Sequence, residues 1–137
     1  MNNYPAEVCF PVHWGEMDAL GHVNNVRYFT WFETARIAYF TRIGLLELSP
    51  LGPILKSTEC EFRRPLQYPA EIISRARVSR IGNSSFTMEY EISETRDPTE
   101  PCAVGAGVIV LIDYTTGRPT PLPPGLRASI EALEGNS

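Results

Sequence analysis

The chain has 137 residues, of which 43% are hydrophobic and 20% are charged, with 12 Lys and Arg against 16 Asp and Glu. This length and composition predict a single globular domain over residues 1–137 with one hydrophobic core, and they exclude disordered and collagen-like classes. The net charge of −4 argues against nucleic acid as the main partner. The 3 cysteines are widely separated and include no C-x-x-C pair, so neither a disulfide framework nor a zinc site is predicted.

No targeting or membrane segment is expected from the sequence. The first residues lack a basic start followed by an apolar core, and no apolar run approaches the ~20 residues of a membrane span. We therefore expect a cytoplasmic protein that does not contact a membrane.

The first elements predicted along the chain are a strand and a long helix. Apolar side chains alternate over residues 7–14, the period of a strand with one buried face, and Pro11 places this strand at or near an edge. After a loop, Asn24 or Asn25 can cap a helix that continues to Gly44. The helix is apolar around most of its circumference, which predicts that it is enclosed on several sides.

Four strands and a short terminal helix are predicted to follow. The strands cover residues 54–63, 71–81, 85–94 and 102–112. A hairpin turn at residues 82–84 joins the second to the third, and the last is so continuously apolar that it predicts a strand covered on both faces. Residues 119–137 form a peripheral extension with a helix near 126–133.

This order of elements predicts an α+β fold. An antiparallel sheet of about five strands would wrap around one long central helix, in the order β-α-β-β-β-β with a short C-terminal helix. Because the helix carries more apolar surface than one such sheet covers, we expect a second subunit to complete the burial.

The segment from His13 to Arg36 concentrates the polar side chains that carry chemistry. Asp18 and His22 lie in a loop that leads into the N-terminus of the predicted helix. Free N–H groups at a helix N-terminus, reinforced by the helix dipole, stabilise an oxyanion. A nearby carboxylate can attack a carbonyl or deprotonate a water that does. Together these are the groups that acyl transfer needs.

These residues also form a motif with a characteristic spacing. It comprises Asp18-x-x-Gly21-His22-Val23-Asn24-Asn25-x-x-Tyr28, followed by Phe32-Glu33-x-x-Arg36. The motif resembles the signature of the hotdog-fold thioesterases of the 4-hydroxybenzoyl-CoA thioesterase type, and the family's order of a strand, a helix and four strands matches the prediction above.

The resemblance implies a reaction and a set of catalytic residues. The reaction is hydrolysis of an acyl-coenzyme A thioester to a free acid and coenzyme A, without a metal or cofactor. The implied catalytic residues are Asp18, as nucleophile or general base, and Asn25, whose backbone N–H would polarise the thioester carbonyl. His22 matches a histidine thought to assist catalysis in plant acyl-carrier-protein thioesterases, but Leu20 replaces their asparagine, which puts a mechanism needing that amide in doubt.

Five residues are predicted to contact the substrate. They are Asn24, Tyr28, Arg80, Ser84 and Ser85. Arg80 lies beside the predicted hairpin turn, where a guanidinium and backbone N–H groups suit the phosphates of coenzyme A. The expected partners are a small acyl-CoA or acyl-carrier-protein thioester and further copies of the chain, as a homodimer or homotetramer.

Other functions fit parts of the sequence. The hydratases and dehydratases of the same fold resemble Asp-x-Asn-Pro-x-His, whereas Asp18 and His22 are only four positions apart with no Asn-Pro between them. A non-catalytic protein that binds acyl-thioesters would keep the fold without turnover. His13 with Asp18 and His22 supplies the residue types of an iron site without its ligand spacing. The absence of Gly-x-Ser-x-Gly excludes an α/β-hydrolase route.

Overall fold

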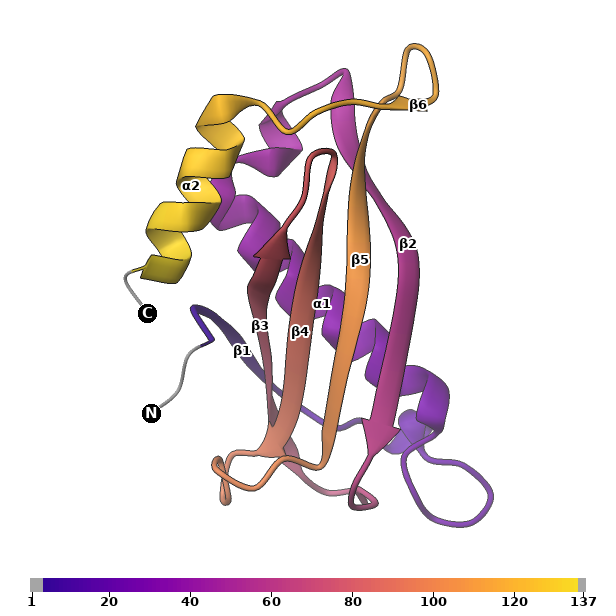
Figure 1. The fold of residues 1–137 in the computed structure, drawn as a ribbon. Helices are drawn as coiled ribbons and strands as arrows, with labels where there is room; N and C mark the ends of the chain where they lie inside the picture. The colour runs from indigo at the N-terminus through magenta and orange to yellow at the C-terminus, as the bar shows by residue number, and fades with distance from the viewer. Residues whose placement is uncertain (1–3, 136–137) are drawn as a thin grey trace.

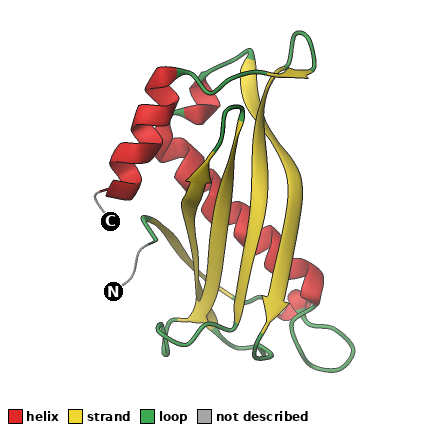
Figure 2. Ribbon diagram, viewed as in Figure 1, coloured by secondary structure: helices red, strands yellow, loops and turns green. Residues whose placement is uncertain are grey.

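The computed structural model describes residues 4–135, which form one six-stranded antiparallel sheet and two α-helices (Figures 1 and 2). The elements are β1 (Ala6–Pro11), η1 (Trp14–Glu16), α1 (Asn25–Ile43), η2 (Leu45–Glu47), β2 (Leu51–Phe62), β3 (Glu71–Ile81), β4 (Ser85–Glu94), β5 (Ala103–Asp113), β6 (Arg118–Pro119) and α2 (Pro124–Gly135). The strands lie in the order β1-β3-β4-β5-β2, with the short β6 on β5. The sheet curls around α1, so the predicted hotdog architecture is confirmed.

Both ends of α1 are set by local interactions that the sequence predicts. The side chain of Asn24 caps the N-terminus by accepting a hydrogen bond of 3.0 Å from the N–H of Val26. At the C-terminus Gly44 adopts a left-handed conformation, with φ of 72°, which costs glycine nothing because it has no Cβ. The helix therefore begins and ends where its capping residues stand.

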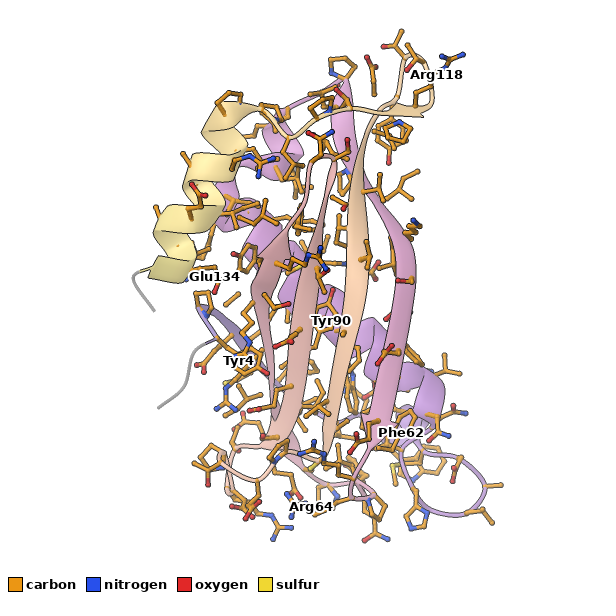
Figure 3. All side chains as sticks on the ribbon, in the orientation of Figure 1. Tyr4, Phe62, Arg64, Tyr90, Arg118 and Glu134 are labelled. Carbon is orange, nitrogen blue, oxygen red and sulfur yellow. The ribbon has the colours of Figure 1, made fainter. Side chains whose placement is uncertain are left out.

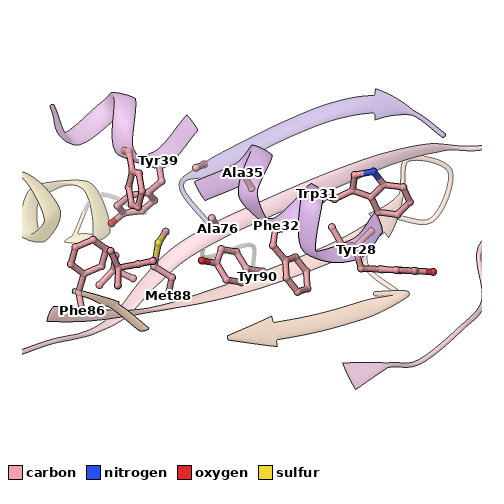
Figure 4. Packing of buried hydrophobic residues seen from close by; sticks show 14 of the residues in the cluster. Tyr28, Trp31, Phe32, Ala35, Tyr39, Ala76, Phe86, Met88 and Tyr90 are labelled. Carbon is pink, nitrogen blue, oxygen red and sulfur yellow. The ribbon is translucent and has the colours of Figure 1, made fainter. Parts of the chain in front are cut away.

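The inner face of the sheet is packed against α1 by aromatic side chains (Figure 4). Phe32 on α1 stacks on Tyr90 of β4 with ring centroids 4.8 Å apart, and both side chains are fully buried. The buried guanidinium of Arg36 donates to the hydroxyl of Tyr90 at 3.2 Å and lies 3.8 Å from Glu33, the ion pair expected from their spacing. Ser74 of β3 donates to the main-chain oxygen of Trp31 at 2.7 Å. These contacts fix the height and rotation of the helix on the sheet.

Several details differ from the prediction. The first strand ends at Pro11, and Trp14 lies in η1 with 75% of its surface exposed, because the chain leaves the sheet before the predicted alternation ends. The strand β5 is covered on its inner face only, and its outward side chains from Val104 to Val110 are half-buried in the single chain. The sheet likewise encloses α1 on one side, and Val26 is 67% exposed. The two-residue β6 was not predicted.

The strand β2 forms one edge of the sheet. Three large apolar side chains on it, Ile54, Leu55 and Phe62, are each more than 40% exposed. A long edge strand with exposed apolar side chains offers unpaired main-chain groups to another strand. No helix within residues 4–135 is both long and apolar enough to cross a membrane.

The contact between α1 and β5 predicts a stability effect at Gly105. A Cβ added there would overlap the ring of Phe32 and lie 2.6 Å from the main-chain oxygen of Glu59. We expect Gly105→Ala to lower the free energy of unfolding by about 1–3 kcal/mol, the usual cost of overpacking, measured by urea denaturation. The matched control is Gly125→Ala in the first turn of α2, where no atom lies within 4 Å of the added Cβ. Equal stability of the two variants would contradict this account of the packing.

Candidate active site

Asp18 is held in a tight turn between η1 and α1. Its Oδ1 accepts hydrogen bonds from the N–H groups of Leu20, at 2.8 Å, and His22, at 3.2 Å. Its own N–H donates to the oxygen of His22 at 2.7 Å. Within residues 4–135, Oδ2 accepts no hydrogen bond. One oxygen of the carboxylate is thus used to orient it, and the other is left for chemistry.

Asn25 is the first residue of α1, so its backbone N–H is one of the donors at the start of the helix. The first N–H groups of a helix have no intrahelical partner. Here Asn24 takes the N–H of Val26 with its side chain and that of Arg27 with its main-chain oxygen. The N–H of Asn25 has no acceptor in the described part of the chain, and the helix dipole makes it a favourable donor to an anionic oxygen.

Asp18 and Asn25 line the same pocket, which has a volume of about 270 Å³. The remaining lining residues come from the loop before α1, from α1, from the end of β2 and from the segment after β2; they are His22, Val23, Tyr28, Phe62, Arg63, Arg64 and Pro65. Figure 3 shows Phe62 and Arg64 at the end of the sheet where the loop between β1 and α1 projects. The pocket therefore joins a carboxylate and a helix N–H to an aromatic wall and two arginines.

The two arginines are held by contacts of different kinds. Arg63 donates through Nε to Glu61 at 2.8 Å, and about half of its side chain is exposed. Arg64 donates through Nη2 to the main-chain oxygen of Glu100 at 2.6 Å and lies 3.7 Å from Asp97. Both guanidinium groups are accessible at the pocket, so they can meet an anionic group of a ligand.

Tyr28 forms a buried wall of the pocket and has a perturbed phenol. Its ring packs edge-on against Phe62 with centroids 5.0 Å apart. Burial raises the pKa of Tyr28 to about 12, with Cys102 and Cys60 adding to the shift and a backbone hydrogen bond at Leu66 opposing it. The phenol therefore stays protonated at neutral pH and can donate a hydrogen bond without carrying charge.

The thiols near the pocket are not suited to nucleophilic catalysis. Burial raises the pKa of Cys60 to about 11 and also raises the pKa of Cys102. A thiolate is the reactive form of cysteine, and both groups remain thiols at neutral pH. This leaves Asp18 as the lining residue best placed to attack a carbonyl or activate water.

The three predicted catalytic residues all line this pocket, whereas of the five predicted substrate contacts only Tyr28 does. His22 lines the pocket and holds Asp18 through its main chain, while its imidazole makes no hydrogen bond within residues 4–135. Asn24 is exposed and acts as the cap of α1. Tyr28 lines the pocket.

Arg80, Ser84 and Ser85 lie at the opposite end of the sheet within one chain. Ser85 pairs with Val110 of β5, whereas the pocket residue Phe62 pairs with Ala103. Seven residues along a strand correspond to about 23 Å. These three residues therefore lie outside the pocket that Asp18 lines.

Two groups of residues at the site were not among the predicted site residues. Phe62 ends β2 and Arg63 and Arg64 follow it, and the pairing of Phe62 with Ala103 of β5 places them at the end of the sheet that carries the pocket. Glu16 contacts both the loop and α1, and its position two residues before Asp18 was the available signal. Within residues 4–135, no group of three or more His, Cys, Asp or Glu side chains could hold a metal ion.

The chain is similar in sequence and in structure to known thioesterases. The model of the Thioesterase-like superfamily matches residues 12–130. The uncharacterized protein YsmA of Bacillus subtilis is 32% identical over 108 residues, covering 78% of this chain and 72% of the relative. A Thermus thermophilus thioesterase, solved in complex with coenzyme A and zinc, is 36% identical with a TM-score of 0.86, and 98% of each chain is covered. A thioesterase superfamily protein from Jannaschia is 29% identical with a TM-score of 0.85, covering 94% of this chain and 82% of that one.

The raised pKa of Tyr28 predicts a change in stability at alkaline pH. The folded-state pKa of about 12 lies above the ordinary tyrosine pKa of 10.0, so the folded chain binds more protons between these two pH values. Stability from this group is fully present below pH 10 and is lost as the pH rises through 12. We expect Tyr28→Phe to show a smaller decrease in the free energy of unfolding between pH 10 and 12 than the wild type, measured by urea denaturation with pH 8 as reference. An identical decrease in both proteins would refute the assignment.

Proposed function

Because the chain belongs to the thioesterase-like superfamily and is a thioester hydrolase, we propose that it hydrolyses acyl-coenzyme A thioesters to a free acid and coenzyme A. The observation that carries the proposal is that Asp18, with Oδ2 unused, lines one pocket with Asn25, whose N–H is unpaired in the described chain. A carboxylate and an oxyanion donor facing one cavity are suited to attack on a thioester carbonyl.

The geometry supports a division of labour during the reaction. The thioester oxygen accepts a hydrogen bond from the N–H of Asn25, which stabilises the negative charge that develops on it. Asp18 acts at the carbonyl carbon in one of two ways. Its Oδ2 attacks directly and expels the coenzyme A thiolate, giving an anhydride that water hydrolyses, or it takes a proton from the water that attacks. In the proposal His22 assists Asp18 from the wall of the pocket.

Arginines at the pocket suit the carrier part of the substrate. Arg63 and Arg64 are accessible beside Phe62, and coenzyme A carries phosphates that guanidinium groups bind. The coenzyme A in the Thermus relative supports this choice over an acyl-carrier protein, which would present the same pantetheine arm on a protein surface. In this proposal the reaction needs no metal or cofactor. The proposed location of the enzyme is the cytoplasm.

We further propose that the enzyme is a homodimer or homotetramer assembled through β2. Antiparallel pairing of two β2 strands about a two-fold axis would cover the exposed Ile54 and Leu55 and satisfy the open edge. This pairing would also make the sheet of the partner subunit run in the opposite direction to the sheet of the first subunit. Arg80 of the partner subunit, with the adjoining hairpin, would then lie at the same end of the assembly as Asp18, which accounts for a phosphate site distant within one chain.

Removal of the carboxylate tests the proposed reaction. Free-thiol release is measured with short, medium, long and aromatic acyl-CoAs, and we expect the wild type to turn over at least one class. Asp18→Asn should lower kcat on that substrate by at least ~10²-fold, the usual contribution of a positioned acid–base group. The matched control is Asp113→Asn, because Asp113 also accepts a hydrogen bond from the N–H two residues later, at 2.8 Å, but lies at the far end of β5.

Three outcomes would contradict the proposal. Full activity in Asp18→Asn would remove that residue from the mechanism. Binding of acyl-CoA without turnover by the wild type would favour a non-catalytic binding protein, and addition of water to an enoyl-CoA would favour the hydratase alternative.

The β2 edge predicts the oligomeric state. Light scattering after size exclusion should give at least twice the chain mass of 15.3 kDa. Ile54→Lys should shift the species towards monomer and lower the activity, because a charge placed in the strand pairing would be desolvated. The control is Thr99→Lys, at an exposed position in the turn between β4 and β5, which should leave the mass unchanged. A monomeric, fully active wild type would refute the assembly.

A further inference from the structure

Glu16 connects the catalytic loop to the central helix by its side chain. Its Oε1 accepts a hydrogen bond of 2.7 Å from the N–H of His13, and its Oε2 accepts one of 3.2 Å from the indole Nε1 of Trp31. Glu16 and Trp31 are fifteen residues apart, and only 3% of Trp31 is exposed. The half-buried carboxylate therefore bridges the start of η1 and the second turn of α1.

The main chain of Glu16 is tied to the residue that caps the helix. Its carbonyl oxygen accepts a hydrogen bond of 2.9 Å from the N–H of Asn24, and the next residue, Met17, pairs with Val23 as an isolated β-bridge. Asp18 follows this bridge on one strand of the loop, and Asn25 follows Asn24 on the other. Asp18 is therefore two residues from Glu16, and Asn25 is one residue from Asn24, whose N–H the main chain of Glu16 binds.

The far end of the bridge is anchored to the sheet. Trp31 accepts a hydrogen bond of 2.7 Å at its main-chain oxygen from Ser74 of β3, and its ring packs against the pocket residue Tyr28 with centroids 5.1 Å apart. The path from Ser74 through Trp31 to Glu16 thus joins a rigid strand to the loop that carries Asp18.

We propose that Glu16 is a positioning residue that sets the separation of the Asp18 carboxylate and the Asn25 N–H through its hydrogen bond to Trp31. This inference rests on the proposed function. Substrate binding depends mainly on the pocket walls, whereas attack on a polarised carbonyl depends on both groups meeting it at once, and a displacement of about 1 Å costs on the order of 10²-fold in rate. Loss of the bridge therefore lowers kcat and leaves KM nearly unchanged.

Glu16→Gln tests this role with almost no change in size. An amide keeps one acceptor oxygen, but its NH₂ group would face an N–H donor, so one of the two hydrogen bonds is lost. We expect kcat for acyl-CoA hydrolysis to fall by about 10- to 100-fold, with KM within about twofold of the wild type. Trp31→Phe, which removes the indole donor together with part of the buried ring, should give a similar decrease in kcat.

The double variant separates positioning through this bond from independent effects. If both residues act through one hydrogen bond, Glu16→Gln combined with Trp31→Phe should have a kcat within about twofold of the slower single variant. The control is Glu47→Gln, the same substitution at the last residue of the other short helix, η2, which should keep the wild-type kcat. All rates are measured well below the melting temperature of each variant.

The possible failures are distinguishable. A wild-type kcat in Glu16→Gln, with or without a lower melting temperature, would overturn the positioning role while Asp18→Asn still reports on the proposed reaction. Multiplicative losses in the double variant would show that the two residues do not act through a shared bond. Absence of any turnover by the wild type would overturn the proposed function, and this inference with it.

Discussion

The stacking of Phe32 on Tyr90 is the contact on which the rest of the molecule depends. It brings the centre of α1 against β4, and Gly105 of β5 makes room for the ring because a Cβ there would overlap it. Arg36 adds a hydrogen bond to the Tyr90 hydroxyl, and Glu33 lies 3.8 Å from the same guanidinium. Once this contact is made, the position of the helix N-terminus relative to the end of the sheet has little freedom. The active-site geometry is therefore a consequence of core packing some distance away.

The helix start combines structural and chemical roles without conflict. Asn24 uses its side chain and main-chain oxygen to cap α1, and the N–H of the pocket residue Asn25 has no acceptor within residues 4–135. Asp18 likewise divides its two oxygens, one accepting bonds from the turn and the other unused within the described residues. In each case the atoms that stabilise the fold differ from those assigned to the chemistry, so local order and reactivity are supplied by one short segment.

Much of the fold was predictable because its signals are local. The hairpin at residues 82–84, the cap at Asn24, the stop at Gly44 and the placement of Pro11 on an edge strand each follow from the conformational preferences of one or two residues. The prediction that Trp14 belongs to the first strand was wrong. Alternation predicts a strand wherever it persists, whereas the chain leaves the sheet when pairing with β3 ends. The short strand β6 was not predicted because two residues are too few to show an alternation of apolar and polar side chains.

At the active site, too, the features that the sequence predicted are local and the features that it did not predict depend on long-range packing. The sequence by itself determined the Asp18 turn, the helix start and hence the chemical class, since these groups are neighbours along the chain. Only the tertiary structure decided that Phe62 and Arg64 close the pocket, that Trp31 reaches back to Glu16, and that Arg80 lies far from Asp18 within one chain. These relations depend on strand register and on the seating of α1, which arise from long-range packing and leave no periodic trace in the sequence.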